Sequence, residues 1–407
     1  MNIRLFSALM LALTSFILIG CDENDEPNGE KSELKFINLT DGELAVAKQN
    51  NMFAWNMFDY VNAESGNTIV SPLSASFAMC MTAEGANGAT RDEIYQAFGF
   101  ENCNNDDVNS YMHKLSNQLM LLDSKTEVSI ANSLWHNKRY NILESFISSM
   151  KTSYNADVFQ LGTNAEDEIN DWCSDKTHGY INDLIPQGSI TPSTAAVLLN
   201  ALYFKGEWAD KFDKKDTERG FFYSIDNSLP TVYYMTGRKK IEYVTAETFT
   251  MASLTFGNGA YAARFLLPNK DKTFDDCITE IKTTGWESIK NNYQSGKTTI
   301  KIPKFTMKNR LDMTPIYQQM GIDRVFTPFA DFSNLSTTGD LCITDAFQSN
   351  FFKIDEEGAT AASVSGGLIG EAAPISIPSF ILDHPFIFAL TERSTGAILF
   401  IGKVEKL

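Results

Sequence analysis

The sequence predicts an α+β fold, with helices in its first half and antiparallel strands after about residue 197. Apolar residues recur at helical spacing before that point and at every second position after it. Hydrophobic residues make up 43% of the 407 residues and include 29 Phe, which is enough for a substantial core. No linker after residue 35 is long enough to divide the chain, so we expect a single large domain.

Three helices are predicted in the first half. Residues 41–64 carry apolar side chains at helical spacing and acids near their start. A buried helix is expected after Ser71, which would cap it, because Pro72 fits the first helical position. A third helix has Thr90 as its expected cap and Gly99 at its end.

The later segments predict strands joined by tight turns. Residues 248–268 read as a hairpin about Gly257-Asn258-Gly259, and residues 386–404 as a second hairpin. The run TTIKIPKFTM, residues 298–307, predicts one strand. The side chains expected on one face of that strand are Ile300, Ile302, Lys304 and Thr306.

Charge and motif content exclude several classes of function. Acidic residues outnumber basic ones by 51 to 34, and the net charge of −17 disfavours binding to nucleic acid. The run SGKTT, residues 295–299, lacks the first Gly of a phosphate-binding loop, since residue 291 is Asn, and is predicted to be a turn. The His residues lie far apart and the Cys residues lack metal-site spacing, so we expect no catalytic residues, metal or cofactor.

The N-terminus is predicted to be a targeting segment. A sixteen-residue apolar run ends in LIGC, which resembles a bacterial lipobox. We expect residues 1–20 to be a lipoprotein signal peptide, Cys21 to be acylated, and residues 21–40 to be an acidic flexible tether. An ordinary signal peptide or a signal anchor is the alternative. The expected location is the bacterial outer membrane with the domain on the cell surface, and a periplasm-facing domain stays open.

The passage IDEEGATAASVSGGLIGEAAPISIP, residues 354–378, is unusual. After three acids it is almost uncharged, and its residues are too small for a core and too few for a membrane span. Residues at alternate positions are all small, and no Pro occurs before Pro374, so the run could pair as a strand without overpacking. These alternating residues are Ala359, Ala361, Ser363 and Ser365.

Six segments in a fixed order resemble the serpin family. They include NTIVSPLSASFAMCMTAEGANGATRDEI, LNALYFKGEWADKF, IKIPKFTM, DEEGATAA and PSFILDHPFIFAL. The resemblance covers about residue 45 to Leu407. It implies a serpin fold for one domain, residues 41–407, with a helical N-terminal part, large mixed and antiparallel sheets, and an exposed reactive-centre loop over about residues 356–378.

The resemblance implies a suicide-substrate protease inhibitor and not an enzyme. A target serine protease, or a cysteine protease, would attack the loop and form an acyl-enzyme. The cleaved loop would then enter the main sheet and trap the protease before hydrolysis. We expect a monomer that forms a covalent complex with its protease and is held at the membrane by the lipid on Cys21. A noninhibitory serpin that acts as a binding module is the alternative.

The resemblance also gives roles to individual residues. The hinge of the loop comprises Glu356, Glu357, Gly358, Ala359, Thr360, Ala361 and Ala362. The region where the sheet opens comprises Ser71, Ser74, Asn200, Trp208, Lys304 and Gln348. Ala359 replaces the usual Thr or Ser and Gln348 a frequent His, which leaves the hydrogen bonding around Ser71, Ser74 and Asn200 open. Glu356 and Lys304 are expected to pair at the top of the sheet, where a surface pair is worth about 0–1 kcal/mol.

Two ways of counting give different reactive bonds. In serpins about seventeen residues run from the hinge Glu to the residue before the cleaved bond, with both ends counted, which from Glu356 leads to Ala372-Ala373. Similarity of PISIP to the cleavage region of relatives leads instead to Ile375-Ser376. The first count is preferred because strand length decides where the protease is carried, and it keeps Pro374 outside the inserted strand. A small Ala372 favours elastase-like or subtilisin-like targets over trypsin-like ones.

Overall fold

The computed structural model describes residues 33–290, 292–339, 341–358 and 378–407. The α-helices in these residues are α1 (Asp41–Asn62), α2 (Pro72–Gly85), α3 (Gly88–Phe98), α4 (Asn105–Gln118), α5 (Glu144–Tyr154), α6 (Ala165–Lys176), α7 (Phe274–Thr284), α8 (Trp286–Lys290) and α9 (Thr314–Gln319). Short 3-10 helices are η1 (Leu119–Leu121), η2 (Lys214–Asp216) and η3 (Arg324–Phe326). The strands are β1 (Thr68–Val70), β2 (Thr126–His136), β3 (Asp157–Gln160), β4 (Ala196–Gly206), β5 (Glu218–Phe221), β6 (Thr231–Thr245), β7 (Phe249–Phe256), β8 (Tyr261–Pro268), β9 (Gln294–Pro303), β10 (Phe305–Asp312), β11 (Phe347–Ile354), β12 (Phe380–Ile381), β13 (Phe386–Glu392) and β14 (Ile398–Val404).

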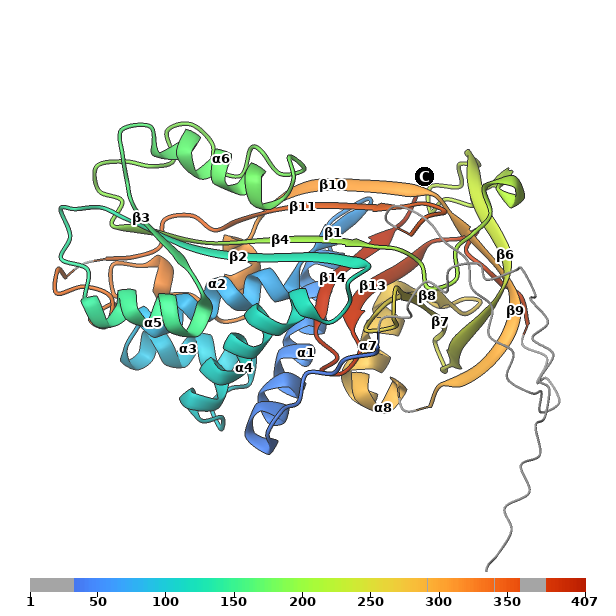
Figure 1. The fold of residues 1–407 in the computed structure, drawn as a ribbon, viewed down its shortest axis with the longest axis horizontal. Helices are drawn as coiled ribbons and strands as arrows, with labels where there is room; N and C mark the ends of the chain where they lie inside the picture. Colours follow the sequence, from blue (N-terminus) through green and yellow to red (C-terminus); the bar gives the residue numbers. More distant parts are fainter. Residues whose placement is uncertain (1–32, 291, 340, 359–377) are drawn as a thin grey trace, which may run out of the picture. The chain divides into compact units, whose positions relative to one another are not determined.

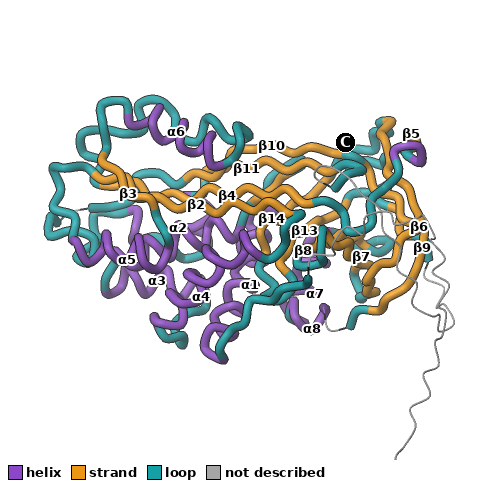
Figure 2. The backbone as a smooth tube through the Cα atoms, viewed as in Figure 1, coloured by secondary structure: helices purple, strands orange, loops and turns teal. Residues whose placement is uncertain are grey.

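These strands form three hydrogen-bonded groups (Figure 2). The largest has the order β1-β14-β13-β8-β7-β6-β9-β12, with β5 on β6. The second is β3-β2-β4, and the third is the pair β10-β11. Most neighbours are antiparallel, but β12 is parallel to β9 and β3 is parallel to β2. The mixed sheets and the helical first part confirm the predicted α+β class.

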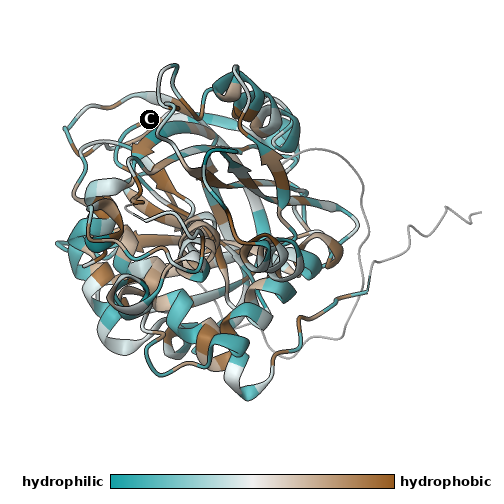
Figure 3. Cartoon of the chain, turned by 90° about the vertical axis from the view of Figure 1, so that its left-hand side faces the viewer, coloured by the Kyte–Doolittle hydropathy of each residue, from teal (hydrophilic) through white to brown (hydrophobic). Residues whose placement is uncertain are grey.

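The groups containing β4 and β11 form one layer with helices on both faces (Figure 1). Helix α6 lies on one face of this layer, whereas α2 and the strands β13 and β14 lie on the other. Figure 3 shows hydrophobic colour along the interior strands and hydrophilic colour on the outer turns of the surrounding helices. The main core fills the space between the layers, with fully buried side chains such as Trp55, Phe77 and Phe265.

Several local predictions are confirmed. Ser71 caps α2 by accepting a hydrogen bond from the amide of Ser74, with Pro72 in the first turn. Gly99 ends α3 in the left-handed conformation at φ 71°, which favours glycine. Both hairpins turn where expected, since β7 pairs with β8 and β13 with β14.

Other local predictions are wrong. Thr90 lies inside α3, whose cap is Asn87, and the Thr90 hydroxyl accepts from the amide of Asp331. Residues 298–307 are not one strand: the chain passes from β9 to β10 at Lys304, so Ile302 is buried whereas Lys304 is exposed. The run 295–299 belongs to β9 and is not a turn.

The described part of the chain begins at residue 33, within the predicted tether of residues 21–40. The end of that predicted tether packs against the domain. Ile37 is buried, and its amide donates to the Ser394 hydroxyl. Ile37 therefore belongs to the folded domain and not to a flexible tether. The predicted signal peptide and Cys21 lie outside the described residues. No helix among the described residues is both long and apolar enough to cross a membrane.

Candidate functional site

Two strands of the central layer each have an unpaired edge. In β4 one edge is bonded to β2, and in β11 one edge is bonded to β10. Both strands are fully described, and no backbone hydrogen bond joins one to the other. The segments that follow the two strands meet, because Glu207 after β4 and Gly358 after β11 form an antiparallel bridge. The strands therefore run in the same direction and diverge below that bridge.

A cavity of about 410 Å³ occupies the space between the two unpaired edges. We call this space the slot. Its walls are residues 195–202 of the β4 side and 341–350 of the β11 side. Helix α2 closes it on the core side with small residues such as Ser74 and Ala78. A single strand needs about 4.8 Å on either side to pair with its neighbours, and two unpaired parallel edges present donors and acceptors to an antiparallel strand.

The segment that follows α6 covers the slot on its other face. The Tyr180 ring stacks on Tyr203 of β4 at 5.7 Å and on Phe351 of β11 at 4.3 Å, measured between ring centroids. The Arg310 Nε atom of β10 donates to the carbonyl of Leu184. This cover bridges both sides of the slot, so a strand entering it must displace or pass under the segment.

Gln348 ties β11 to the start of α2. Its Oε1 atom accepts from the amide of Ser71 and its Nε2 atom donates to the carbonyl of Ser71, both at 2.8 Å. The Ser71 hydroxyl donates to the carbonyl of Leu399 at 2.7 Å and accepts from the amide of Ser74. The side-chain amide of Gln348 thus makes two hydrogen bonds at the position where relatives frequently have His.

Asn200 faces the slot from β4 but does not join this network. Its Nδ2 atom donates to Asn132 Oδ1 at 2.8 Å, while its Oδ1 atom has no hydrogen-bond partner among the described residues. The same holds for Ser349 Oγ and Asn350 Oδ1 on the β11 side, and all three residues line the slot. Buried polar atoms without partners are costly, so the slot favours a polar occupant that can bond them.

The hinge begins with a tight turn at the top of the slot. Asp355 and Gly358 exchange backbone hydrogen bonds at 3.1 and 3.3 Å, which reverses the chain after β11. Gly358 has φ 99°, and a Cβ atom there would lie 2.3 Å from the Trp208 amide nitrogen. Only glycine fits this conformation and this approach. At Gly358 the chain has therefore reversed direction and pairs antiparallel with Glu207 at the end of β4.

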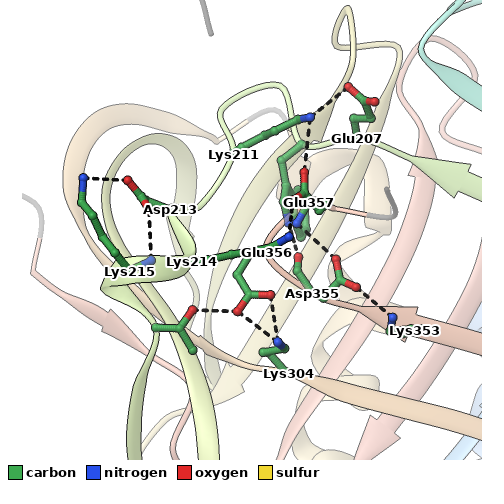
Figure 4. Close-up of polar contacts among 12 residues, drawn as sticks. Glu207, Lys211, Asp213, Lys214, Lys215, Lys304, Lys353, Asp355, Glu356 and Glu357 are labelled. Carbon is green, nitrogen blue, oxygen red and sulfur yellow. Dashed lines mark hydrogen bonds and ion pairs between the residues drawn. The ribbon is translucent and has the colours of Figure 1, made fainter. Parts of the chain in front are cut away.

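Lysines hold the acids of this turn (Figure 4). Lys304 Nζ lies 3.0 and 2.9 Å from the two carboxylate oxygens of Glu356, and the Thr217 hydroxyl donates to the same carboxylate at 2.7 Å. Burial alone raises the pKa of Glu356, but the hydrogen bonds from Lys304 and Thr217 outweigh it and hold that pKa below its usual value. Lys214 lies 2.7 Å from Glu357, and its hydrogen bond lowers the pKa of that acid.

The ion pair of Glu356 and Lys304 is not a pair of two exposed side chains. The side chain of Glu356 is only 5% exposed, against 39% for Lys304. Trp208 completes the turn: its Nε1 atom donates to the carbonyl of Asp355 at 2.9 Å, its amide donates to the carbonyl of Glu357, and its ring stacks on Phe256. The turn is fixed to the end of β4 from both sides.

Comparison with known proteins agrees with this arrangement. Residues 48–407 match the family model described as serpin, serine protease inhibitor. The chain belongs to the serpin family. Iripin-3 of Ixodes ricinus is 31% identical over 90% of this chain and 95% of that protein. Leukocyte elastase inhibitor A of Mus musculus is 29% identical over 88% and 98%. The native structure of the thermophilic serpin tengpin superposes with a TM-score of 0.80 and 25% identity, over 93% of this chain and 97% of that one.

Serpins are mostly protease inhibitors that bind their target proteases. In this serpin the structure brings Ser71, Ser74 and Gln348 together, and joins Glu356 and Lys304 beside Trp208. Asn200 lies apart from Gln348. The hinge residues Ala359, Thr360, Ala361 and Ala362 and both candidate reactive bonds, Ala372-Ala373 and Ile375-Ser376, lie outside the described residues.

Sequence reasoning missed two contributors to this site. Thr217 bonds the hinge acid from the position directly after η2, a short element with no sequence signal of its own. Tyr180 covers the slot from the loop after α6, where an aromatic residue among polar ones is the only hint.

Proposed function

We propose that this serpin is a suicide-substrate inhibitor of serine endopeptidases, with cysteine endopeptidases as a second class. The observation that carries the proposal is the slot between two unpaired strand edges directly below the turn at Gly358. An inserted loop would pair with both edges and bond the unpartnered polar atoms. The free energy released by that pairing would drive transport of the bound protease.

The chemistry is that of acyl transfer. The protease nucleophile attacks the carbonyl carbon of the reactive bond, an ester or thioester forms, and the amine of the next residue leaves with the proton supplied by the protease base. Insertion then moves the acylated protease from the top of the slot to its far end. Distortion of the protease active site prevents water from completing the hydrolysis.

The bridge between Glu207 and Gly358 sets a register for insertion. Each further loop residue would lie opposite the residue one earlier in β4, because the pairing is antiparallel. Ala372, fourteen residues beyond Gly358, would lie opposite Ser193, which lines the lower end of the slot. Cleavage after Ile375 would require three more inserted residues, including Pro374. The register therefore supports Ala372-Ala373 as the reactive bond.

A small residue at the cleavage site suits a narrow specificity pocket, so elastase-like and subtilisin-like proteases are the proposed targets. The test is a denaturing gel of the protein with pancreatic elastase, subtilisin and trypsin, followed by mass spectrometry of the released peptide. A covalent complex and a peptide starting at Ala373 are expected. A peptide starting at Ser376 would favour the second count, and a fast trypsin complex would contradict the specificity. Cleavage of the chain by every protease without any complex would establish the noninhibitory binding module.

We propose further that the mature protein is a monomer attached to the bacterial outer membrane by acylated Cys21, with its domain on the cell surface. The lipobox-like LIGC supports the anchor, and the acidic residues after it support export to the surface. Cys21→Ala should abolish membrane fractionation, and a variant still found with membranes would contradict the anchor. Protease treatment of intact cells distinguishes a surface domain, which is digested, from a periplasm-facing one.

A further inference from the structure

One hairpin carries a cluster of exposed large apolar side chains. Each member is 47–60% exposed. The cluster comprises Phe221, Tyr223, Ile225, Leu229 and Tyr233, and we call it the hairpin patch. Several exposed apolar side chains on one hairpin mark an interaction surface more often than a single one does.

Backbone hydrogen bonds fix the hairpin patch to the rest of the domain. Strand β5 pairs with the start of β6, from Glu218 opposite Tyr234 to Phe221 opposite Thr231. The amide of Phe222 donates to the carbonyl of Pro230. The amide of Tyr223 donates to the carbonyl of Asp383 at 2.7 Å, and the amide of Ile225 to the carbonyl of Glu405. Aromatic and aliphatic groups fixed in this way lose little conformational entropy when a partner covers them.

The patch borders the place where the reactive-centre loop returns to the domain. The described chain resumes at Pro378 and enters β12, which pairs with β9. Five residues after Pro378, Asp383 is bonded to Tyr223 of the patch, and the next residue, His384, stacks on the Tyr223 ring at 4.7 Å. Lys301 of β9 also pairs with Glu218 of β5 at 2.9 Å.

A protease bound at the reactive bond cannot lie far from this return point. Both proposed bonds lie within six residues of Pro378, which span at most about 20 Å when extended. A protease of about 240 residues has a radius of gyration of about 18 Å. The domain surface around Pro378 is therefore within reach of the protease body.

We propose that the hairpin patch is a second contact for the target protease, binding an apolar surface beside the part of its cleft that holds residues after the reactive bond. The proposal rests on the inhibitory function. Because the protease leaves this end of the molecule during insertion, the patch assists only the first encounter. Its loss should slow association and leave the stoichiometry of inhibition unchanged.

The experiment compares a patch variant with a matched control. The patch variant is Phe221→Ser/Ile225→Ser/Leu229→Ser. The control is Leu121→Ser/Phe329→Ser, which removes apolar groups 65% and 78% exposed from other elements. The association rate constant is measured with whichever of pancreatic elastase and subtilisin forms the covalent complex faster with the unmodified chain, together with stoichiometry, thermal unfolding and sedimentation.

We expect the patch variant to associate about tenfold more slowly or worse, with stoichiometry and unfolding unchanged, and the control to stay within about twofold. Equal rates for the patch variant and the unmodified chain would overturn the contact while leaving inhibition in place. Dimers of the unmodified chain that the patch variant dissociates would make the patch a self-association surface and overturn the proposal. If neither protease forms a complex, the inhibitory function fails and the second contact fails with it.

Discussion

Ala361→Arg tests whether the loop enters the slot in the register of the Glu207–Gly358 bridge. Ala361 lies three residues beyond Gly358 and would face Phe204, three residues before Glu207. Phe204 packs against Phe256 and Tyr261 on the core side of β4. A guanidinium inserted there would be buried without a partner.

The expected cost follows from that environment. An uncompensated buried charge costs about 3–5 kcal/mol. If about 2 kcal/mol of this is already felt in the transition state for insertion, the insertion rate falls about 30-fold. Deacylation then competes, and the variant becomes mainly a substrate. The number of inhibitor molecules consumed per protease should rise from near one to more than about ten.

Ala362→Arg is the matched control. In the same register Ala362 faces Tyr203, on the side covered by Tyr180 and His178, and the side chain of His178 is 52% exposed. An Arg on this side would lie near the half-exposed His178, where water can hydrate its charge, so its effect should be much smaller. Titration of a fixed amount of elastase with each variant measures the stoichiometry. Equal values for both variants would refute the register, and unchanged inhibition by Ala361→Arg would refute insertion at this site.

Three further predictions concern stability and the barrier to insertion. Glu356→Gln should lower the free energy of unfolding in guanidinium by about 2 kcal/mol, because charge-assisted hydrogen bonds to a buried acid are lost. Glu357→Gln, whose partner Lys214 is exposed, should lower it by less than about 1 kcal/mol. Equal losses of stability in the two variants would contradict the role of burial. Tyr180→Ala should increase the rate at which inhibitory activity is lost on warming by about tenfold, because two ring stacks across the slot are removed. An unchanged rate would show that the segment after α6 does not limit insertion. The pKa of Glu43 is about 2: burial raises it, but bonds from Lys114, Ser110 and Thr40 outweigh burial. This depressed folded-state pKa contributes stability above about pH 4.5 that is lost as the pH falls toward 2, about 3 kcal/mol in all, and Glu43→Gln should remove that dependence in pH-dependent unfolding measurements.

The elements that sequence predicted well are those with strong local signals. Ser71-Pro72 and Gly99 mark helix ends by their own backbone chemistry, and residues 257–259 can form little but a turn. The break at Lys304 has no such signal, because β9 and β10 are consecutive in sequence and the change of sheet depends on packing far away. Strand β2 was not predicted, because its burial alternates only from Thr126 to Ala131 and is continuous from Asn132 to Trp135.

The candidate site divides in the same way. The hinge and the residues around Ser71 could be placed by resemblance, since each belongs to a quoted segment. The resemblance could not predict the hydrogen-bond partners of individual atoms. The side chain of Gln348 bonds the backbone of Ser71, and Asn200 has an oxygen in the slot without a partner among the described residues. The hydrogen bond to Glu356 from Thr217 could not be predicted, because Thr217 lies 139 residues away in the chain.

Amide hydrogen exchange in β4 and β11, before and after complex formation with elastase, tests the central claim most directly. The amides on the unpaired edges of these strands have no backbone partner across the slot, so they should exchange early in the unreacted protein. Insertion predicts strong new protection in residues 196–206 and 347–354, because both edges then pair with the loop. Unchanged exchange in these two strands, in a sample where the covalent complex has formed, would contradict loop insertion between them.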